Sequence, residues 1–369
     1  MAERRVTYRE AMDIKNTERL REVLGTLPPF VKDFFRAIDA RATTRTKISY
    51  AYDLRVFFEF LKAMNPVYKD KELRDFTLED LERVTARDLE EYLEYLQLYD
   101  VPEDRVKGGT RETNSVVGLK RKFSSLRSFY NYLFRQEMIH TNPTQLVEMP
   151  KIHEKTIVRL DGEEVQLLLD YIENCSSTLT GKALESFRKT KERDLALVTL
   201  LLGTGIRVSE CVGLDVEDLD FRNNCIRVVR KGGNEALVYF GEEVREALQK
   251  YLSVREGITP LAGHEHALFY STQRRRMTIR AVENLVEKYA SAVTTTKHIT
   301  PHKLRSTYGT ALYRETGDIY LVAAVLGHKD VNTTRRHYAA MDDERRRSAA
   351  DVVRLRQEAD RQESSKNDA

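Results

Sequence analysis

Residues 300–341 read TPHKLRSTYGTALYRETGDIYLVAAVLGHKDVNTTRRHYAAM. His302 and Arg305 stand three residues apart in this stretch, so on one helix they share a face and can hold one anion together. His328 follows a glycine in a short turn, and Tyr338 comes ten residues later as a candidate covalent nucleophile. This order suits phosphate chemistry if the rest of the chain supplies further positive charge.

The composition indicates a chain of more than one domain. At 369 residues and 41% hydrophobic content, it can bury two or three domain cores. Charged residues make up 32% of the chain, but the formal net charge is only +3. Local charge rather than the total sets the affinity for phosphates. A nucleic-acid binder of this composition must therefore gather its basic residues on one face.

The cysteines and the apolar runs indicate the compartment. Cys175, Cys211 and Cys225 lie in apolar surroundings and lack metal-ligand spacing, which predicts buried, reduced thiols. The first residues contain no apolar leader, and no apolar run approaches the roughly 18 residues of a membrane span. We therefore expect a cytoplasmic protein that has no membrane partner.

The first part of the chain, residues 1–150, predicts one helix after another. Residues 16–38 form an amphipathic segment that two consecutive prolines interrupt. Thr85 and Asp88 have the spacing of a capped helix start. The polar, glycine-containing stretch 102–113 predicts a loop. We expect residues 1–150 to form a helical domain.

A change of pattern near residue 150 predicts a second domain. Residues 151–158 lose helical periodicity, which indicates an interdomain linker before a domain at 159–345. Within that domain, residues 194–202 predict a nearly all-apolar core helix. Residues 226–240 are rich in β-branched residues and alternate between apolar and polar ones on both sides of Lys-Gly-Gly-Asn. This pattern predicts a β-hairpin. We expect residues 346–369 to form a last helix and a frayed tail.

Arg207 is a candidate phosphate ligand that follows Gly203-Thr204-Gly205 at the end of the apolar helix. The glycines let the backbone turn sharply, so that a new helix can present Arg207 from its first turn. Its guanidinium could clamp a phosphate bidentately, and Glu210, one turn on, could orient it. Taken alone, the pattern favours a surface arginine paired with Glu210.

The other candidate residues also have ordinary structural interpretations. Lys231 at the hairpin tip could protonate a leaving oxygen as a general acid, but turns often carry solvated lysines. His302 at a helix start could bind an anion or cap the helix. His328 could be structural, and Tyr338 could be a core aromatic, because the chain has 18 tyrosines.

Taken in order, the segments TGIRVSE, VVRKGGNEALVYF, TPHKLR and VLGHKDVNTTRRHY resemble the tyrosine recombinase (phage integrase) family. The resemblance covers about residues 43–345 and is strongest over 194–341. Within the family, the chain resembles a Xer-type recombinase. It is most similar to the XerS-like subgroup, which acts without a second recombinase, in the block SFRKTKERDLA, in RKGG and TPHKLR, and in an extra N-terminal helical segment at about 1–40. The family pattern HxLRHTFA departs here to HKLRSTYG, where Ser306 and Thr307 lie outside the catalytic set.

The resemblance implies a fold and a reaction. The fold is mainly α with a small antiparallel β-sheet. A helical, SAM-like core-binding domain and an α+β catalytic domain would close around DNA as a C-shaped clamp. Tyr338 would attack the scissile phosphate to give a 3′-phosphotyrosyl intermediate. The pKa of an unperturbed tyrosine is about 10, so the phenol needs a proton acceptor, and His302 is the candidate.

The same resemblance assigns the remaining roles. Arg207, Arg305 and His328 would stabilise charge on the non-bridging oxygens. Lys231 would protonate the departing 5′ oxygen, and Glu210 would orient Arg207. The covalent link conserves the energy of the phosphodiester, so we expect no cofactor, no metal and no ATP. Consistent with this expectation, the chain contains no GxxxxGK[ST] motif.

Basic residues on two predicted helices are the candidates for DNA contact. A run of charge is also typical of a solvated helix face, so the residues remain candidates. They are Arg45, Lys47, Lys120, Arg121, Lys122 and Arg127.

The implied partner is double-stranded DNA with a specific recombination site, bound by a homotetramer on two such sites. Off DNA, we expect a monomer or weak dimer. The helix within 346–369 would dock on a neighbouring protomer, or else pack on its own domain. An accessory DNA translocase is a further expected partner.

Resolution of chromosome or plasmid dimers is the expected role. The alternatives are an integrase or excisionase of a mobile element, a type IB topoisomerase, and a DNA-binding protein that has lost catalysis.

Overall fold

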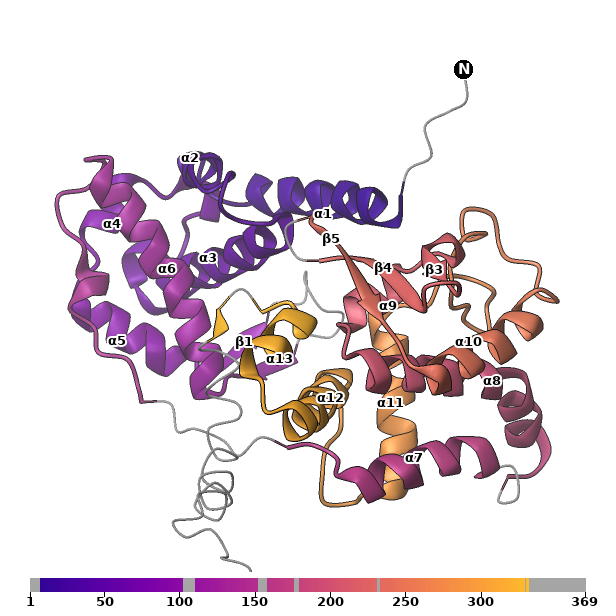
Figure 1. Cartoon of the computed structure of the whole chain (residues 1–369). Coiled ribbons are helices and arrows are strands. Elements are labelled where there is room, and N and C mark those ends of the chain that lie inside the picture. The colour runs from indigo at the N-terminus through magenta and orange to yellow at the C-terminus, as the bar shows by residue number, and fades with distance from the viewer. Residues whose placement is uncertain are drawn as a thin grey trace, which may run out of the picture. The chain divides into compact units, whose positions relative to one another are not determined.

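The computed structural model divides the chain into two compact units, residues 1–155 and 156–369 (Figure 1). No helix in the described part of the chain is long and apolar enough to cross a membrane. The structure describes residues 7–101, 110–151, 158–175, 179–230, 233–328 and 330–331.

The first unit consists of helices and one small hairpin. Its core is rich in aromatic side chains, and Phe57 contacts the rings of Tyr92 and Tyr130 edge-on at centroid distances of 5.3 and 6.2 Å. Both α1 and α6 pack against α3. The elements are α1 (Tyr8–Gly25), α2 (Val31–Ala37), α3 (Thr44–Met64), α4 (Leu78–Glu82), α5 (Ala86–Tyr95), β1 (Leu98–Val101), β2 (Thr110–Thr113) and α6 (Val116–Arg135), with short 3-10 turns η1 (Pro66–Tyr68), η2 (Leu73–Asp75) and η3 (Pro143–Gln145).

Two predicted features of this unit are confirmed. The proline pair separates α1 from α2, because proline lacks the N–H group that a continuing helix needs. Thr85 caps α5: its hydroxyl accepts a hydrogen bond from the Asp88 N–H at 3.3 Å, and the Asp88 carboxylate accepts one from the Thr85 N–H at 2.7 Å.

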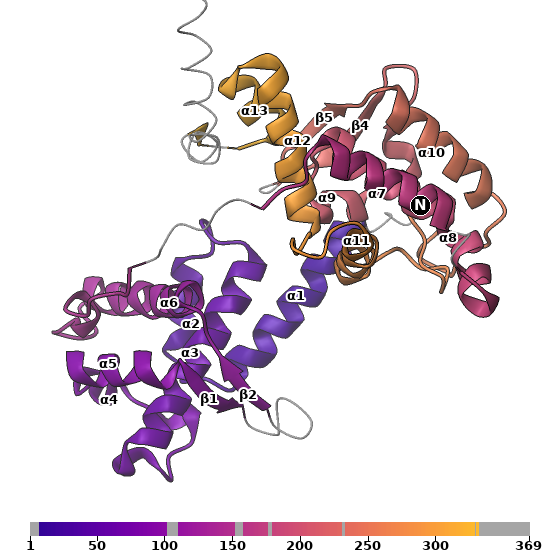
Figure 2. The ribbon, with the colours of Figure 1, turned by 90° about the horizontal axis from the view of Figure 1, so that it is seen from below.

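The prediction of a loop over residues 102–113 is wrong for residues 110–113. Residues Thr110–Thr113 form β2, which pairs antiparallel with β1 (Figure 2). Cross-strand side chains stabilise the pair: the Tyr99 hydroxyl donates to Glu112 at 2.6 Å, and Arg111 donates to Asp100 at 3.0 Å. These partners lie 13 and 11 residues apart, beyond the range that local composition reports.

The second unit is built around α8, a long helix whose middle is buried. Helices α7, α10 and α12 all pack against it. A three-stranded antiparallel sheet in the order β3-β4-β5 lies beside α9. The elements are α7 (Gly162–Asn174), α8 (Gly181–Thr204), α9 (Val208–Gly213), η5 (Val216–Asp218), β3 (Leu219–Asp220), β4 (Cys225–Val229), β5 (Glu235–Tyr239), α10 (Glu242–Arg255), α11 (Ile279–Val293), α12 (Pro301–Thr316) and α13 (Ile319–Leu326).

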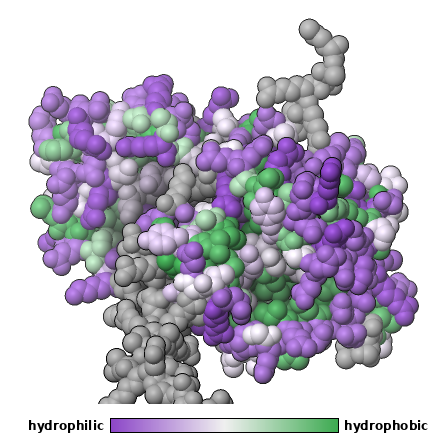
Figure 3. Space-filling model, viewed as in Figure 1, coloured by the Kyte–Doolittle hydropathy of each residue, from purple (hydrophilic) through white to green (hydrophobic). Residues whose placement is uncertain are grey.

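The predicted apolar helix, hairpin and buried thiols of this unit are confirmed. Residues 194–202 lie in α8, and β4 and β5 form the hairpin, with Val229 opposite Glu235 in the last pair. All three cysteines are buried and free. Helix α13 is apolar on most sides, and Tyr320 and Leu321 remain exposed on it. The space-filling view shows apolar residues over this helix, and further apolar patches lie elsewhere on the same face (Figure 3). The fold is thus mainly α with small antiparallel sheets.

Candidate active site

Helix α12 presents His302 and Arg305 from its first two turns. Thr300 occupies the N-cap position and Pro301 the first helical position, where the missing N–H of proline costs nothing. His302 is exposed, whereas Arg305 is only 5% exposed. The Arg305 guanidinium donates hydrogen bonds to the carbonyl oxygens of Gly205 and Leu326. These two bonds place Arg305 between the ends of α8 and α13.

The end of α8 requires glycine at position 205. Gly205 has a φ of +62°, in the left-handed region that ends many helices. A Cβ atom at this position would lie 2.4 Å from Cδ1 of Tyr308 on α12, closer than any real contact. The glycine therefore permits both the sharp turn and the close approach of α12. The next helix, α9, begins three residues later, with Arg207 as its N-cap residue.

Glu210 holds Arg207 with both carboxylate oxygens. One oxygen accepts from the Arg207 backbone N–H at 2.8 Å, and the other accepts from Nη1 of its guanidinium at 2.8 Å. The side chain of Glu210 is 4% exposed and that of Arg207 is 34% exposed. A charge-assisted pair of this kind fixes the direction of the guanidinium. Nη2 of Arg207 also donates to the carbonyl oxygen of Gly327 at 3.3 Å.

Arg207 and Arg305 meet at the C-terminal end of α13. Gly327 ends this helix with a φ of +62°, and the His328 N–H donates to the Ala323 carbonyl at 2.9 Å. The exposed carbonyls of a helix C-terminus carry partial negative charge, which favours guanidinium groups. The turn that carries His328 is therefore the place where the two arginines, far apart in the sequence, come together.

The departures from the family pattern have structural roles on α12. The Thr307 hydroxyl accepts from the Leu160 N–H at 3.0 Å and donates to the Lys303 carbonyl at 3.0 Å. It thereby ties the segment before α7 to α12. The Ser306 hydroxyl donates to the His302 carbonyl at 3.1 Å. That both residues lie outside the catalytic set remains a prediction.

Two predicted residues, Lys231 and Tyr338, lie outside the described residues. The neighbouring Arg230 is described, and sequence reasoning missed it. Its guanidinium donates to the carbonyls of Ala324 at 3.3 Å and Val325 at 2.9 Å. In the sequence, Arg230 stands directly before the tip of the predicted hairpin. That position does not reveal a hydrogen-bond partner 94 residues away.

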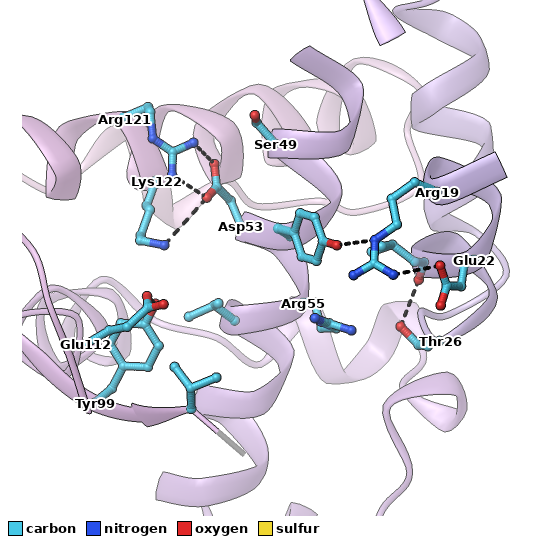
Figure 4. Close-up of a pocket in the computed structure, with 14 residues that line it drawn as sticks. Arg19, Glu22, Thr26, Ser49, Asp53, Arg55, Tyr99, Glu112, Arg121 and Lys122 are labelled. Atoms are coloured by element: carbon cyan, nitrogen blue, oxygen red, sulfur yellow. Dashed lines mark hydrogen bonds and ion pairs between the residues drawn. The ribbon is translucent and has the colours of Figure 1, made fainter. Parts of the chain in front are cut away.

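In the first unit, Arg121 and Lys122 surround a buried aspartate (Figure 4). Arg121 donates two hydrogen bonds of 2.8 Å to Asp53, which is only 2% exposed. The Ser125 hydroxyl donates to the same carboxylate at 2.6 Å, and Lys122 Nζ lies 3.8 Å from it. This cluster joins α6 to α3. A pocket of about 660 Å³ beside it has both basic and acidic lining residues.

The other four candidates for DNA contact differ in their surroundings. Arg127 donates to the carbonyls of Thr144 and Val147, so it holds the segment after α6. Lys47 pairs with Asp39. Arg45 is exposed near the start of α3, and Lys120 is partly exposed on α6.

Comparison with known proteins identifies the class. Residues 147–345 match the phage integrase family. Tyrosine recombinase XerC of Caldanaerobacter subterraneus subsp. tengcongensis is 33% identical over 345 residues, covering 90% of this chain and 88% of that protein. Tyrosine recombinase XerS of Lactococcus lactis subsp. cremoris is 32% identical over 353 residues, covering 87% of this chain and 93% of that protein.

Solved structures share the fold. XerH site-specific recombinase, in a post-cleavage complex with palindromic difH substrate, matches with a TM-score of 0.59 at 21% identity, covering 87% of this chain and 83% of that one. The Tn1549 transposon integrase with circular intermediate DNA also matches with a TM-score of 0.59, at 22% identity, covering 87% of this chain and 98% of that one.

The chain belongs to the phage integrase family of tyrosine recombinases. It is a site-specific DNA recombinase with relatives of the Xer type. The family and the Xer type expected from the motifs are confirmed.

Proposed function

We propose that Arg207, Arg305 and His328 hold the scissile phosphate and that Tyr338 attacks it. The observation that carries this proposal is the meeting of both guanidiniums at the end of α13, next to His328. A guanidinium has five N–H donors, so the bonds of Arg207 to Glu210 and Gly327 leave it able to grip an anion. Donors fixed in advance stabilise developing charge without reorganising.

The chemical step is a transesterification with balanced proton transfers. The Tyr338 oxygen forms a bond to phosphorus, and the bond from phosphorus to the 5′ oxygen breaks. His302 accepts the phenolic proton, and Lys231 protonates the 5′ oxygen. In the reverse step, a 5′-hydroxyl attacks the phosphotyrosyl bond and Tyr338 leaves. The exposure of His302 one turn before Arg305 supports this role, because an acceptor must reach the nucleophile.

A nicked suicide substrate tests the assignment. After cleavage the short fragment diffuses away, so the covalent complex accumulates and is counted on a denaturing gel. Tyr338→Phe should form none while it still binds the DNA. Tyr320→Phe is the matched control, since Tyr320 is exposed on α13, and it should behave like the unmodified enzyme. A covalent complex formed by Tyr338→Phe would overturn the proposal.

Removal of either arginine that is proposed to hold the phosphate should slow formation of the covalent complex. Arg207→Ala and Arg305→Ala each remove a donor to the non-bridging oxygens, which typically costs about 10²- to 10³-fold in rate. The rate of covalent complex formation at saturating DNA measures this loss. Unchanged rates in the Arg207→Ala enzyme would show that Arg207 is the structural partner of Glu210 and no more.

The proposed DNA contacts are Arg45 and Lys120. Four further candidates also have partners within the first unit: Lys47, Arg121, Lys122 and Arg127. Basic side chains that meet phosphates make affinity fall steeply with salt. Binding measured across a salt series should therefore give a slope that becomes shallower by about one when a phosphate-contacting lysine or arginine is removed.

The proposed biological role is resolution of chromosome or plasmid dimers in the cytoplasm, by a homotetramer on two DNA sites. Off DNA we propose a monomer or weak dimer, and on DNA a protomer contact made by the helix within 346–369, a range that lies outside the described residues. An accessory DNA translocase is a further proposed partner. The similarity to the tyrosine recombinases XerC and XerS supports recombination as the reaction on which this role depends. Mapping the bound site in the genome tests it: one site on the chromosome or on a plasmid supports dimer resolution, and a site at the ends of a mobile element supports an integrase or excisionase instead.

A further inference from the structure

Arg230 contacts the same helix end as the two candidate phosphate arginines. Its guanidinium bonds to the carbonyls of Ala324 and Val325, Arg305 bonds to Leu326, and Arg207 bonds to Gly327. Four successive carbonyls thus accept hydrogen bonds from three guanidiniums. The Ala324 carbonyl also accepts from the Gly327 N–H at 3.0 Å. The last carbonyls of a helix have no i+4 N–H partner within the helix, so side-chain donors such as these guanidiniums are favourable there.

The backbone of Arg230 belongs to the β4–β5 hairpin. Its N–H donates to the Asn234 carbonyl at 2.8 Å, and its carbonyl accepts from the Gly233 N–H at 3.0 Å. The main chain of Arg230 therefore closes the hairpin, while its side chain reaches α13, 94 and 95 residues further along the chain. The planar fork of a guanidinium spans two adjacent carbonyls, which a lysine ammonium does with less directional precision.

Gly327 accommodates this contact. A Cβ atom at position 327 would lie 1.8 Å from Nη1 and 2.5 Å from Cζ of Arg230. The φ of +62° already favours glycine there, and the guanidinium removes any remaining space. Arg230 thus packs directly on the backbone of the turn that leads to His328.

We propose that Arg230 is a positioning residue: it holds the hairpin against α13 and so sets the next residue, Lys231, relative to the phosphate held by Arg207 and Arg305. This inference rests on the proposed function, in which Lys231 is the general acid. A general acid must come within hydrogen-bond reach of the leaving oxygen. A displacement of about 1 Å can cost about 10²-fold in rate.

Two suicide substrates separate the effect of Arg230 on the leaving group from an effect on folding. One has an ordinary scissile phosphate, and the other carries sulfur at the bridging 5′ position, because a thiolate leaves without being protonated. Arg230→Ala should slow cleavage of the ordinary substrate by about 10- to 10²-fold and that of the sulfur substrate by less than about threefold. Lys231→Ala should show the same selectivity, and Arg230→Lys should recover part of the loss.

Arg227→Ala is the matched control, because Arg227 lies on β4, three residues before Arg230, and pairs with Asp218 at 2.9 Å. It should cleave both substrates at the unmodified rate. Thermal unfolding and DNA affinity are measured for every variant, and Arg230→Lys supplies the test if Arg230→Ala does not fold.

The outcomes distinguish the two levels of the proposal. If Arg230→Ala slows both substrates equally, or neither, while Lys231→Ala slows only the ordinary one, the proposed function stands and the role of Arg230 is refuted. If Lys231→Ala slows both substrates equally, Lys231 is not the general acid, and the role of Arg230 falls with that assignment.

Discussion

Replacing Gly205 by alanine tests the packing that brings the candidate active site together. Two separate costs follow from the structure. The φ of +62° strains any residue with a Cβ by about 1–2 kcal/mol. The new Cβ would also lie 2.4 Å from the Tyr308 ring, and overpacking of this kind typically costs about 1–3 kcal/mol. We therefore expect Gly205→Ala to lower the free energy of unfolding by about 2–5 kcal/mol.

A double-mutant cycle in urea separates the two costs. In a Tyr308→Ala background the clash with the ring is removed and Cδ2 of Leu326, at 3.0 Å, is the remaining close atom, so Gly205→Ala should then lower the free energy of unfolding by less, about 1–3 kcal/mol. Gly213→Ala is the matched control, since a Cβ there meets nothing within 4 Å, and it should change stability by less than about 1 kcal/mol. An equal cost of Gly205→Ala with and without the Tyr308 ring would refute the reasoning.

Two further predictions concern buried groups in the second unit. Glu210→Gln keeps the shape of the side chain but removes the charge that orients Arg207. Covalent complex formation should therefore slow by about 10- to 10²-fold with little change in DNA affinity. An unchanged rate would contradict the orienting role. Burial raises the pKa of the Cys211 thiol to about 12, so at pH 8 only about one thiol in ten thousand is ionised. Iodoacetamide at pH 8 should therefore leave Cys211 unmodified in the native protein and modify it in urea, as peptide mass spectrometry would show; rapid native labelling would contradict its burial.

Local features of this protein were predictable because their partners lie close in the sequence. The capping of α5 by Thr85 and Asp88 uses residues three apart, and the break between α1 and α2 follows from proline chemistry. The hairpin of β4 and β5 follows from a short glycine-containing turn. The β1–β2 pair was missed, since its strands are stabilised by side chains from opposite ends of a longer connection.

The sequence by itself determined the residue types and order of the candidate site, and the order was specific enough to indicate the tyrosine recombinase family. Only the tertiary structure decided which of these residues meet. Arg207 reaches Gly327 across 120 residues, Arg305 reaches Gly205 across 100, and Arg121 reaches Asp53 across 68. Within a helix, interacting residues lie three or four positions apart, so the spacing of residues in the sequence reveals these local contacts. Contacts between distant side chains depend on how α8, α12 and α13 pack, and that packing placed Arg230, which no pattern had indicated, at the same helix end.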